Sequence, residues 1–223
     1  MSEILPPLKV LLIVGSTRPG RTSDLLMPWL EEIFDADSRF DLSVEDLRDW
    51  PLPMFQEEPA KIGNPASPNY SDSLVGQWNR AVTAADAYVF VTPEYNHSVP
   101  GVLKNAIDSV FFSPGFRNKP CAFVGYSISP TGAVRAIEHL IQIVSTLEAM
   151  PLRNAVMIGK VSEAFDEQGK PVDPMTQLVA QIMADDVHWW GNALRSARAQ
   201  GQLPPAQLRI RQAIEGFQAG KAG

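Results

Sequence analysis

Groups that bind anions are concentrated in the stretch GSTRPGRTS, from Gly15 to Ser23. It contains two glycines, four hydroxyl side chains and two arginines, and it lies between an apolar run and a pattern with helical spacing. Free N–H groups and the dipole at a helix start favour an anion, and guanidinium groups add strong donors. The stretch therefore indicates a phosphate-binding loop, although an ordinary helix start with surface arginines uses the same residue types.

The spacing of this stretch differs from two familiar phosphate loops. It has no Gly-Lys-Ser/Thr ending, as in a Walker A loop, and no G-x-G-x-x-G pattern, as in a dinucleotide fold. The candidate ligands are therefore hydroxyl and guanidinium groups of the stretch itself. They are Ser16, Arg18, Arg21, Thr22 and Ser23, with Thr17 as a further hydroxyl donor.

Two further loops are also rich in small and polar residues. They are TPEYNHSVPG at 92–101 and YSISPTG at 126–132, and each follows an apolar run. Such sequences expose backbone groups that can contact a ligand. Whether the three loops form one site depends on the elements that position them.

The apolar runs predict a sheet covered on both faces. Runs at 9–15, 87–93, 121–127 and 155–161 are rich in β-branched or aromatic residues and nearly continuous, as in strands buried between helices. A fifth run, at 40–47, alternates apolar and polar residues, which is typical of a half-exposed edge strand.

Helical spacing fills the gaps between these runs. Apolar residues recur three and four apart in 25–34, 134–147 and 175–194. Shorter helices are predicted at 71–86, with Ser71 or Asp72 as its N-cap, and at 101–111.

The alternation of strands and helices predicts an α/β fold. We expect a flavodoxin-like three-layer sandwich with a five-stranded parallel sheet in the order 2-1-3-4-5. Ligands bind to such sheets where the strand order reverses, outside the carboxyl ends of the strands. The loops after strands 1, 3 and 4 meet there, and these are the three polar loops.

The chain divides into one domain at 1–199 and a tail at 200–223, for which at most a short helix and a frayed end are expected. The segment 51–70 is rich in proline and polar residues and is predicted to be a long loop, as in lids and interfaces.

Composition excludes several partners. With 25 acidic and 19 basic residues among 223, the net charge is −6, which disfavours nucleic acid and anionic membranes. The single cysteine, Cys121, excludes an internal disulfide and is expected to be buried. Three separated histidines form no metal-binding pattern. The chain has no run of 18 apolar residues and no signal-peptide pattern, so a cytoplasmic location is expected.

The stretch TPEYNHSVPGVLKNAIDSV resembles the motif of the NADPH-dependent FMN reductase family, and GSTRPGRTS resembles the phosphate loop of that family. The resemblance implies an oxidoreductase that passes hydride from NADPH or NADH to bound FMN. The electrons would then pass to a small-molecule acceptor such as flavin, a quinone, an azo compound or chromate. It also implies self-association to a dimer or tetramer.

The family motif assigns roles to individual residues. Ser16, Arg18 and Ser23 match positions that contact the phosphate, whereas Arg21 stands where many members have serine. A second set matches the segment that lies along the isoalloxazine ring, mostly through backbone amides: Pro93, Glu94, Tyr95 and Asn96. Ser127 belongs to the third loop at the edge of the ring. Because the flavin carries the chemistry, no catalytic side chain is expected, and neither Glu94 nor His97 is assigned as an acid or base.

The third loop departs from the glycine-rich pattern of many members. It keeps Gly125, Ser127 and Gly132 but places ISPT between the last two. This altered loop keeps open the alternative of a flavin-binding sensor with little turnover. The other alternative is a flavodoxin-like electron carrier that does not use NAD(P)H, against which Arg18 and the PEYNHSVPG match count. Oxidation of NADPH with and without a quinone distinguishes them.

Overall fold

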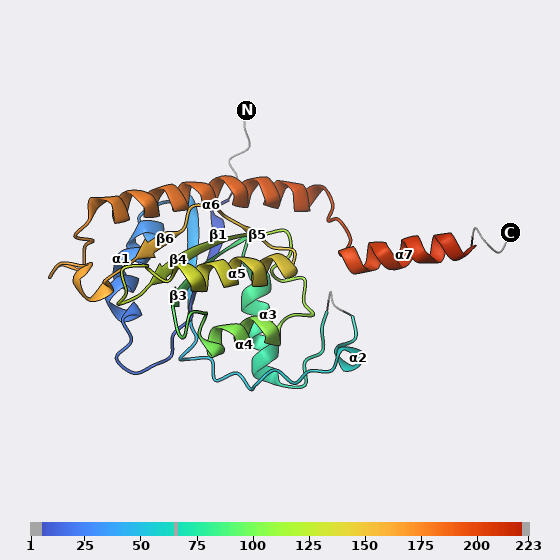
Figure 1. The fold of residues 1–223 in the computed structure, drawn as a ribbon. Helices are drawn as coiled ribbons and strands as arrows, with labels where there is room; N and C mark the ends of the chain where they lie inside the picture. Colours follow the sequence, from blue (N-terminus) through green and yellow to red (C-terminus); the bar gives the residue numbers. More distant parts are fainter. Residues whose placement is uncertain (1–5, 65–66, 220–223) are drawn as a thin grey trace, which may run out of the picture.

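The computed structural model describes residues 6–64 and 67–219 as a three-layer α/β sandwich (Figure 1). Every strand pairing in the sheet is parallel, and the order is β2-β1-β3-β4-β5, with β6 also paired to β4. The strands are β1 (Leu8–Val14), β2 (Phe40–Asp46), β3 (Ala87–Pro93), β4 (Pro120–Tyr126), β5 (Met150–Pro151) and β6 (Val156–Ile158). The predicted fold class and strand order are confirmed.

The prediction of five strands was wrong in one respect, because two short strands share the fifth position. β5 pairs with the start of β4 and β6 with its end. Between them the chain leaves the ladder over 152–155, where the Asn154 amide donates to Asp186 of the last long helix at 2.7 Å. The strand predicted at 155–161 ends at Ile158, and a 3₁₀ turn, Val161–Glu163, follows.

The helices cover both faces of the sheet. They are α1 (Ser23–Asp35), α2 (Pro59–Ile62), α3 (Ser73–Ala84), α4 (Gly101–Ser109), α5 (Val134–Thr146), α6 (Pro174–Gln200) and α7 (Ala206–Ala219). Asp72 caps α3 by accepting from Leu74 N at 2.7 Å, and Asp173 caps α6 in the same way through Met175 N at 2.9 Å. Where two N-cap residues were possible for α3, the structure therefore selects Asp72.

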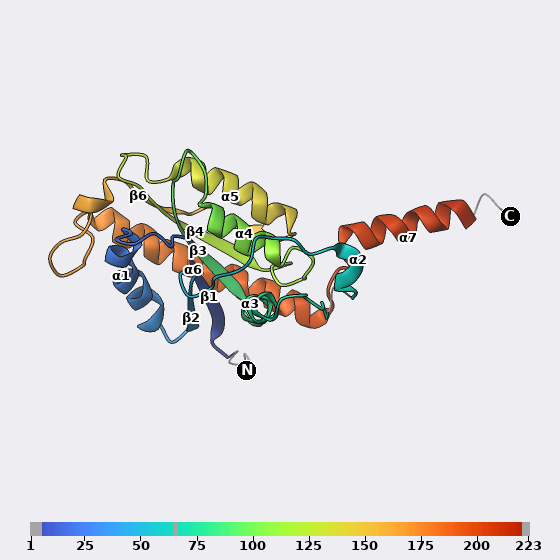
Figure 2. The same ribbon diagram turned by 90° about the horizontal axis from the view of Figure 1, so that it is seen from below.

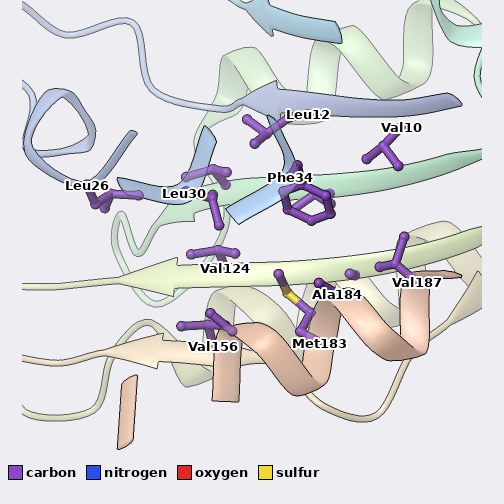
Figure 3. Packing of buried hydrophobic residues seen from close by; sticks show 14 of the residues in the cluster. Val10, Leu12, Leu26, Leu30, Phe34, Val124, Val156, Met183, Ala184 and Val187 are labelled. Carbon is purple, nitrogen blue, oxygen red and sulfur yellow. The ribbon is translucent and has the colours of Figure 1, made fainter. Parts of the chain in front are cut away.

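Two apolar cores form because successive strand residues point to opposite faces of the sheet. One core joins the strands to α1 and α6, and the other joins them to α3, α4 and α5. Figure 3 shows part of the first core, in which strand residues meet Leu26, Leu30 and Phe34 of α1 and Met183 and Val187 of α6. β2 pairs only with β1 and is partly exposed, as expected of an edge strand.

The loop at 51–70 and the tail are also positioned by specific contacts. Asn105 of α4 accepts from Phe55 N at 2.8 Å and donates to Pro53 O at 2.9 Å, which holds the start of this loop against the helix. The tail contains α7, a helix of 14 residues, which is longer than the sequence led us to expect. Among the described residues, no helix combines the length and apolar character needed to cross a bilayer.

A buried lysine lies at the amino end of β4. Lys119 donates to Thr83 O at 2.9 Å and to the Tyr88 hydroxyl at 3.2 Å, and it is almost fully buried. Burial, reinforced by the nearby charge of Arg198, lowers the pKa of Lys119 to about 8. Cys121 is fully buried as predicted, and burial raises the pKa of its thiol.

The pKa of Lys119 predicts how stability depends on pH. Because the folded-state pKa lies below the ordinary value of 10.5, the unfolded chain binds more protons between these values, and stability rises with pH there. The free energy of unfolding of the wild type, relative to Lys119→Met, should increase by about 1–3 kcal/mol from pH 7 to pH 10. Urea unfolding across this range measures the difference, and a difference independent of pH would contradict the assignment.

Candidate active site

The loops after β1, β3 and β4 meet around a cavity of about 210 Å³ at the carboxyl edge of the sheet. Its lining consists of Ser16, Arg18, Thr22, Pro93, Glu94, Tyr95, Tyr126, Ser127, Ile128 and Val161. All the site residues predicted from the sequence belong to this lining except Arg21, Ser23 and Asn96. The fold thus brings the three polar loops to one place.

The first loop approaches the cavity from the start of α1. Ser16 is fully buried, and its hydroxyl lies 2.8 Å from the hydroxyl of Tyr95, which ties the first loop to the second. Arg18 is exposed at the cavity. Thr22 precedes α1 but makes no capping bond through its side chain in the described structure. The start of α1 is therefore open to an external acceptor of hydrogen bonds.

Two buried hydroxyls beside this helix start have no hydrogen-bond partner among the described residues: Ser23 Oγ and Tyr126 Oη. A buried polar group without a partner is costly and calls for an explanation, such as a missing ligand. Burial raises the pKa of Tyr126. Weak hydrogen bonding with the neighbouring hydroxyls of Ser23 and Ser16 opposes the shift, although neither contact has the distance and angles of a normal hydrogen bond. Tyr126 therefore remains protonated at neutral pH and can donate a hydrogen bond into the cavity.

Arg21 has a different place from the one its residue type suggested. Its guanidinium is buried and donates to Asp46 (2.6 Å), to Asp24 (2.8 Å) and to the carbonyl of Ser16. Arg48 contacts the same two carboxylates at 3.1 Å. The donors of Arg21 are thus directed at the loop and at the end of β2, and they fix the shape of the first loop.

The second loop contains a tight reverse turn. Tyr95 N donates to Ser98 O at 2.9 Å, and Ser98 N donates to Tyr95 O at 3.0 Å. The two residues between them, Asn96 and His97, have φ values of 50° and 64°, and asparagine and histidine are among the residues that most often adopt positive φ. Both are exposed. The sequence YNHS therefore forms a turn of the primed type that projects beyond β3.

Glu94 connects the second loop to the helix that follows the third. Its carboxylate accepts from Arg135 Nη1 at 2.7 Å and from the Arg135 backbone N–H at 3.1 Å. Burial would raise the pKa of Glu94, but the hydrogen bonds and charge of Arg135 outweigh burial and hold it below its usual range. The carboxylate is ionised and already engaged, so it is poorly placed to act as a general base.

The third loop packs closely onto β6. Ser127 N donates to Ile158 O at 3.0 Å, and the Ser127 hydroxyl accepts from Ser129 N at 2.9 Å. A Cβ added to Gly159 would lie 2.3 Å from Pro130 O, so only glycine fits beneath this loop. The side chain of Ile128 is 80% exposed at the edge of the cavity. The loop is therefore well anchored and places an apolar side chain at the entrance.

A second hollow, of about 520 Å³, adjoins the first loop at Thr17. The segment that follows β2 and the start of α4 line the rest of it, through Leu47, Arg48, Trp50, Pro51, Leu52, Met54, Gly101, Val102 and Asn105. Its walls are largely apolar, as in many pockets that bind small molecules.

Sequence reasoning missed Tyr126. It is the last residue of a buried strand and the first of the loop at 126–132, but it was given no role in binding. Its place at the carboxyl end of β4, where ligands bind in such sheets, is the signal that could have identified it.

Comparisons with known proteins show the family and the fold of the chain. The model of a family described as NADPH-dependent FMN reductase matches residues 8–163. An NAD(P)H-dependent FMN reductase of Pseudomonas aeruginosa is 34% identical, over 84% of this chain and 97% of that protein. A quinone reductase of Escherichia coli is 33% identical, over 76% of this chain and 83% of that protein. The structure of the flavoenzyme FerB, an NAD(P)H:acceptor oxidoreductase from Paracoccus denitrificans, has a TM-score of 0.65 at 24% identity and covers 83% of this chain and 98% of that one.

The contacts of Arg21 predict that it contributes to stability. Arg21→Met should lower the free energy of unfolding, measured without added flavin, by about 2–3 kcal/mol. This loss is at or below the low end of the range for breaking a buried ion pair, because Arg48 still contacts Asp46 in the variant. Arg18→Met is the matched control; because Arg18 is exposed, its effect should stay within about 0.5 kcal/mol. Equal effects in urea unfolding would show that Arg21 does not hold the loop.

Proposed function

Because the chain belongs to the NADPH-dependent FMN reductase family, we propose that it binds FMN in the cavity between the three loops and passes electrons from NAD(P)H to a small-molecule acceptor. The chain is an oxidoreductase, and FMN and NAD(P)H are its cofactors. A quinone is the acceptor class we favour, with flavin, azo compounds and chromate as other candidates. The names of several relatives support this choice, including the quinone reductase of E. coli.

The observation that best supports the position of FMN is the group of unsatisfied donors at the start of α1. The open helix start and the unpartnered hydroxyls of Ser23 and Tyr126 require an acceptor with several oxygens. A phosphate meets that requirement, and Arg18 is placed to add a charge-assisted bond from the exposed side. We assign Ser16 and Thr22 to the same part of the cofactor and Arg21 to the support of their loop.

The loop at 93–97 is proposed to lie along the flavin ring. The side chain of Glu94 is occupied by Arg135, so Glu94 would contribute through its backbone, as would Pro93, Tyr95 and Asn96. Ser127 and Ile128 would border another edge. When bound, FMN would supply the redox chemistry, which is to accept hydride and to pass electrons to the second substrate. The chain orients the ring and excludes water, and no side chain is assigned a proton transfer.

Self-association is part of the proposal. Two apolar side chains that line the 520 Å³ hollow, Met54 and Val102, are exposed, and so is Phe55, which follows Met54 in the chain. Such a patch is typical of a contact surface, and a second subunit placed there would close the open side of the site. A cytoplasmic location is also proposed, on the basis of the single buried thiol and the use of NAD(P)H.

The proposed phosphate site predicts discrimination between two flavins. The protein should bind FMN far more tightly than riboflavin, and Arg18→Ala should weaken FMN binding by about 1.5–3 kcal/mol, as expected for a hydrogen bond to a charged group. Tyr126→Phe should also weaken binding, with little change in the affinity for riboflavin. Titration calorimetry with both flavins measures these differences. Equal affinity of the wild type for FMN and riboflavin would refute the phosphate assignment.

The single open side of the cavity predicts the kinetic mechanism, in which the two substrates bind in turn. Since the 93–97 loop backs one side of the site, nicotinamide and acceptor must use the other side in turn, which gives parallel lines in double-reciprocal plots. Glu94→Gln and His97→Ala should slow flavin reduction without abolishing it, as followed by flavin absorbance after rapid mixing. Intersecting lines would indicate that both substrates bind together. FMN binding without NADPH oxidation would instead support an electron carrier. Slow NADPH oxidation, whether or not a quinone is added, would support a sensor.

A further inference from the structure

The helix α7 is an arm whose base is held by specific contacts. Arg117 forms an ion pair with Glu148 and donates to Leu203 O, and Glu148 accepts from Ala206 N, at the start of α7, at 2.8 Å. The hydrogen bond from Ala206 and the charge of Arg117 hold the pKa of Glu148 below its usual range, so this anchor is ionised at neutral pH. Figures 1 and 2 both show α7 extending away from the sandwich, beyond the end of α6.

One side of the arm is apolar and uncovered. Ile210, Ala213, Ile214 and Phe217 have the spacing of a helical stripe, and all four are exposed, Phe217 by 74%. By position on the helix, Arg209 and Arg211 lie on opposite flanks of this stripe. Arg211 also contacts Glu215 of the same helix at 3.1 Å, an exposed pair that neutralises little charge. An isolated helix of this length is marginally stable in water, so a surface that covers the stripe would account for the helix.

The outer face of α6 carries a matching stripe. Met175, Leu178, Ile182 and Trp189 are exposed, on the side opposite to the residues of α6 that pack in the core. Asp185 and Asp186 lie on the two flanks of this stripe. Asp185 forms an exposed pair with Arg39, which neutralises little of its charge. Asp186 accepts from the uncharged amide of Asn154 and keeps its negative charge.

We propose that α7 of one copy of the chain docks along the outer face of α6 of a second copy. The two stripes are both apolar, and the arginines that flank one complement the aspartates that flank the other. Pairing of two α7 arms would instead place arginines against arginines, which is unfavourable. In Figures 1 and 2, α7 points away from α6 of its own chain, so the stripe faces no surface formed by the described residues of the same copy. Each copy has one α7 arm and one exposed α6 face, so both arms and both faces are covered in a two-fold symmetric dimer.

The first experiment measures the mass of the assembly by sedimentation. An arm variant carries Ile214→Glu and Phe217→Glu, and a face variant carries Leu178→Glu and Ile182→Glu. Each should at least halve the mass found for the wild type, and mixing the two should restore a larger species, because the mixed pair keeps one intact arm and one intact face. Leu208→Glu, on the opposite side of α7, is the matched control and should leave the mass unchanged.

A cross-linking experiment tests which helices meet in the assembly. Copies with Ile214→Cys and copies with Ile182→Cys are mixed and treated with a bismaleimide; Cys121 is buried and does not compete. The expected product joins one copy of each kind. A product that joins two Ile214→Cys copies would mean that the arms pair with each other and would overturn the proposal.

Two further results would also overturn it: a wild type of 24.5 kDa at all concentrations, or an arm variant with the mass of the wild type. Circular dichroism confirms that the variants fold. FMN binding should be unchanged in the arm variant, so failure of this contact is distinguishable from failure of the proposed function.

Discussion

The connections that follow β1 and β3 leave the sheet toward opposite faces, and this determines the position of the candidate active site. After β1 the chain turns to α1 on one face of the sheet, and after β3 it turns to α4 on the other. Neighbouring parallel strands whose connections leave toward opposite faces necessarily leave a crevice between their loops. Backbone groups in that crevice cannot pair across the sheet, and a helix start points into it. This topology therefore determines where the cavity lies, and the side chains determine its shape and polarity.

Three polar contacts convert the crevice into a defined cavity. The Arg21–Asp46 pair joins the first loop to β2, the Ser16–Tyr95 contact joins the first loop to the second, and Glu94–Arg135 joins the second to α5. Each contact uses polar groups that could otherwise have faced a ligand. The groups left without protein partners among the described residues, Ser23 Oγ and Tyr126 Oη, are therefore informative, because they lie beside a helix start that no side chain caps.

Much of this arrangement was readable from the sequence, because strands covered on both faces must be apolar throughout and helices beside them must be apolar on one side. That pattern identified the strand order and therefore the three loops. The role of Arg21 was not readable, because it depends on Asp46, 25 residues further along the chain. Local composition does not reveal which of two neighbouring arginines finds a buried carboxylate. The division of the fifth strand position was hidden for a similar reason, since Asn154 contacts a helix 32 residues away.

The length of α7 could have been inferred from its apolar spacing, but its direction could not. The direction depends on Arg117 and Glu148, which belong to the opposite end of the sheet from the cavity. No residue of α6 or α7 lines the cavity. Association through these two helices would therefore leave the entrance to the site open, whereas association through Met54 and Val102 would cover the hollow beside it. The two apolar surfaces thus have separable consequences, one for the size of the assembly and the other for access to the flavin site.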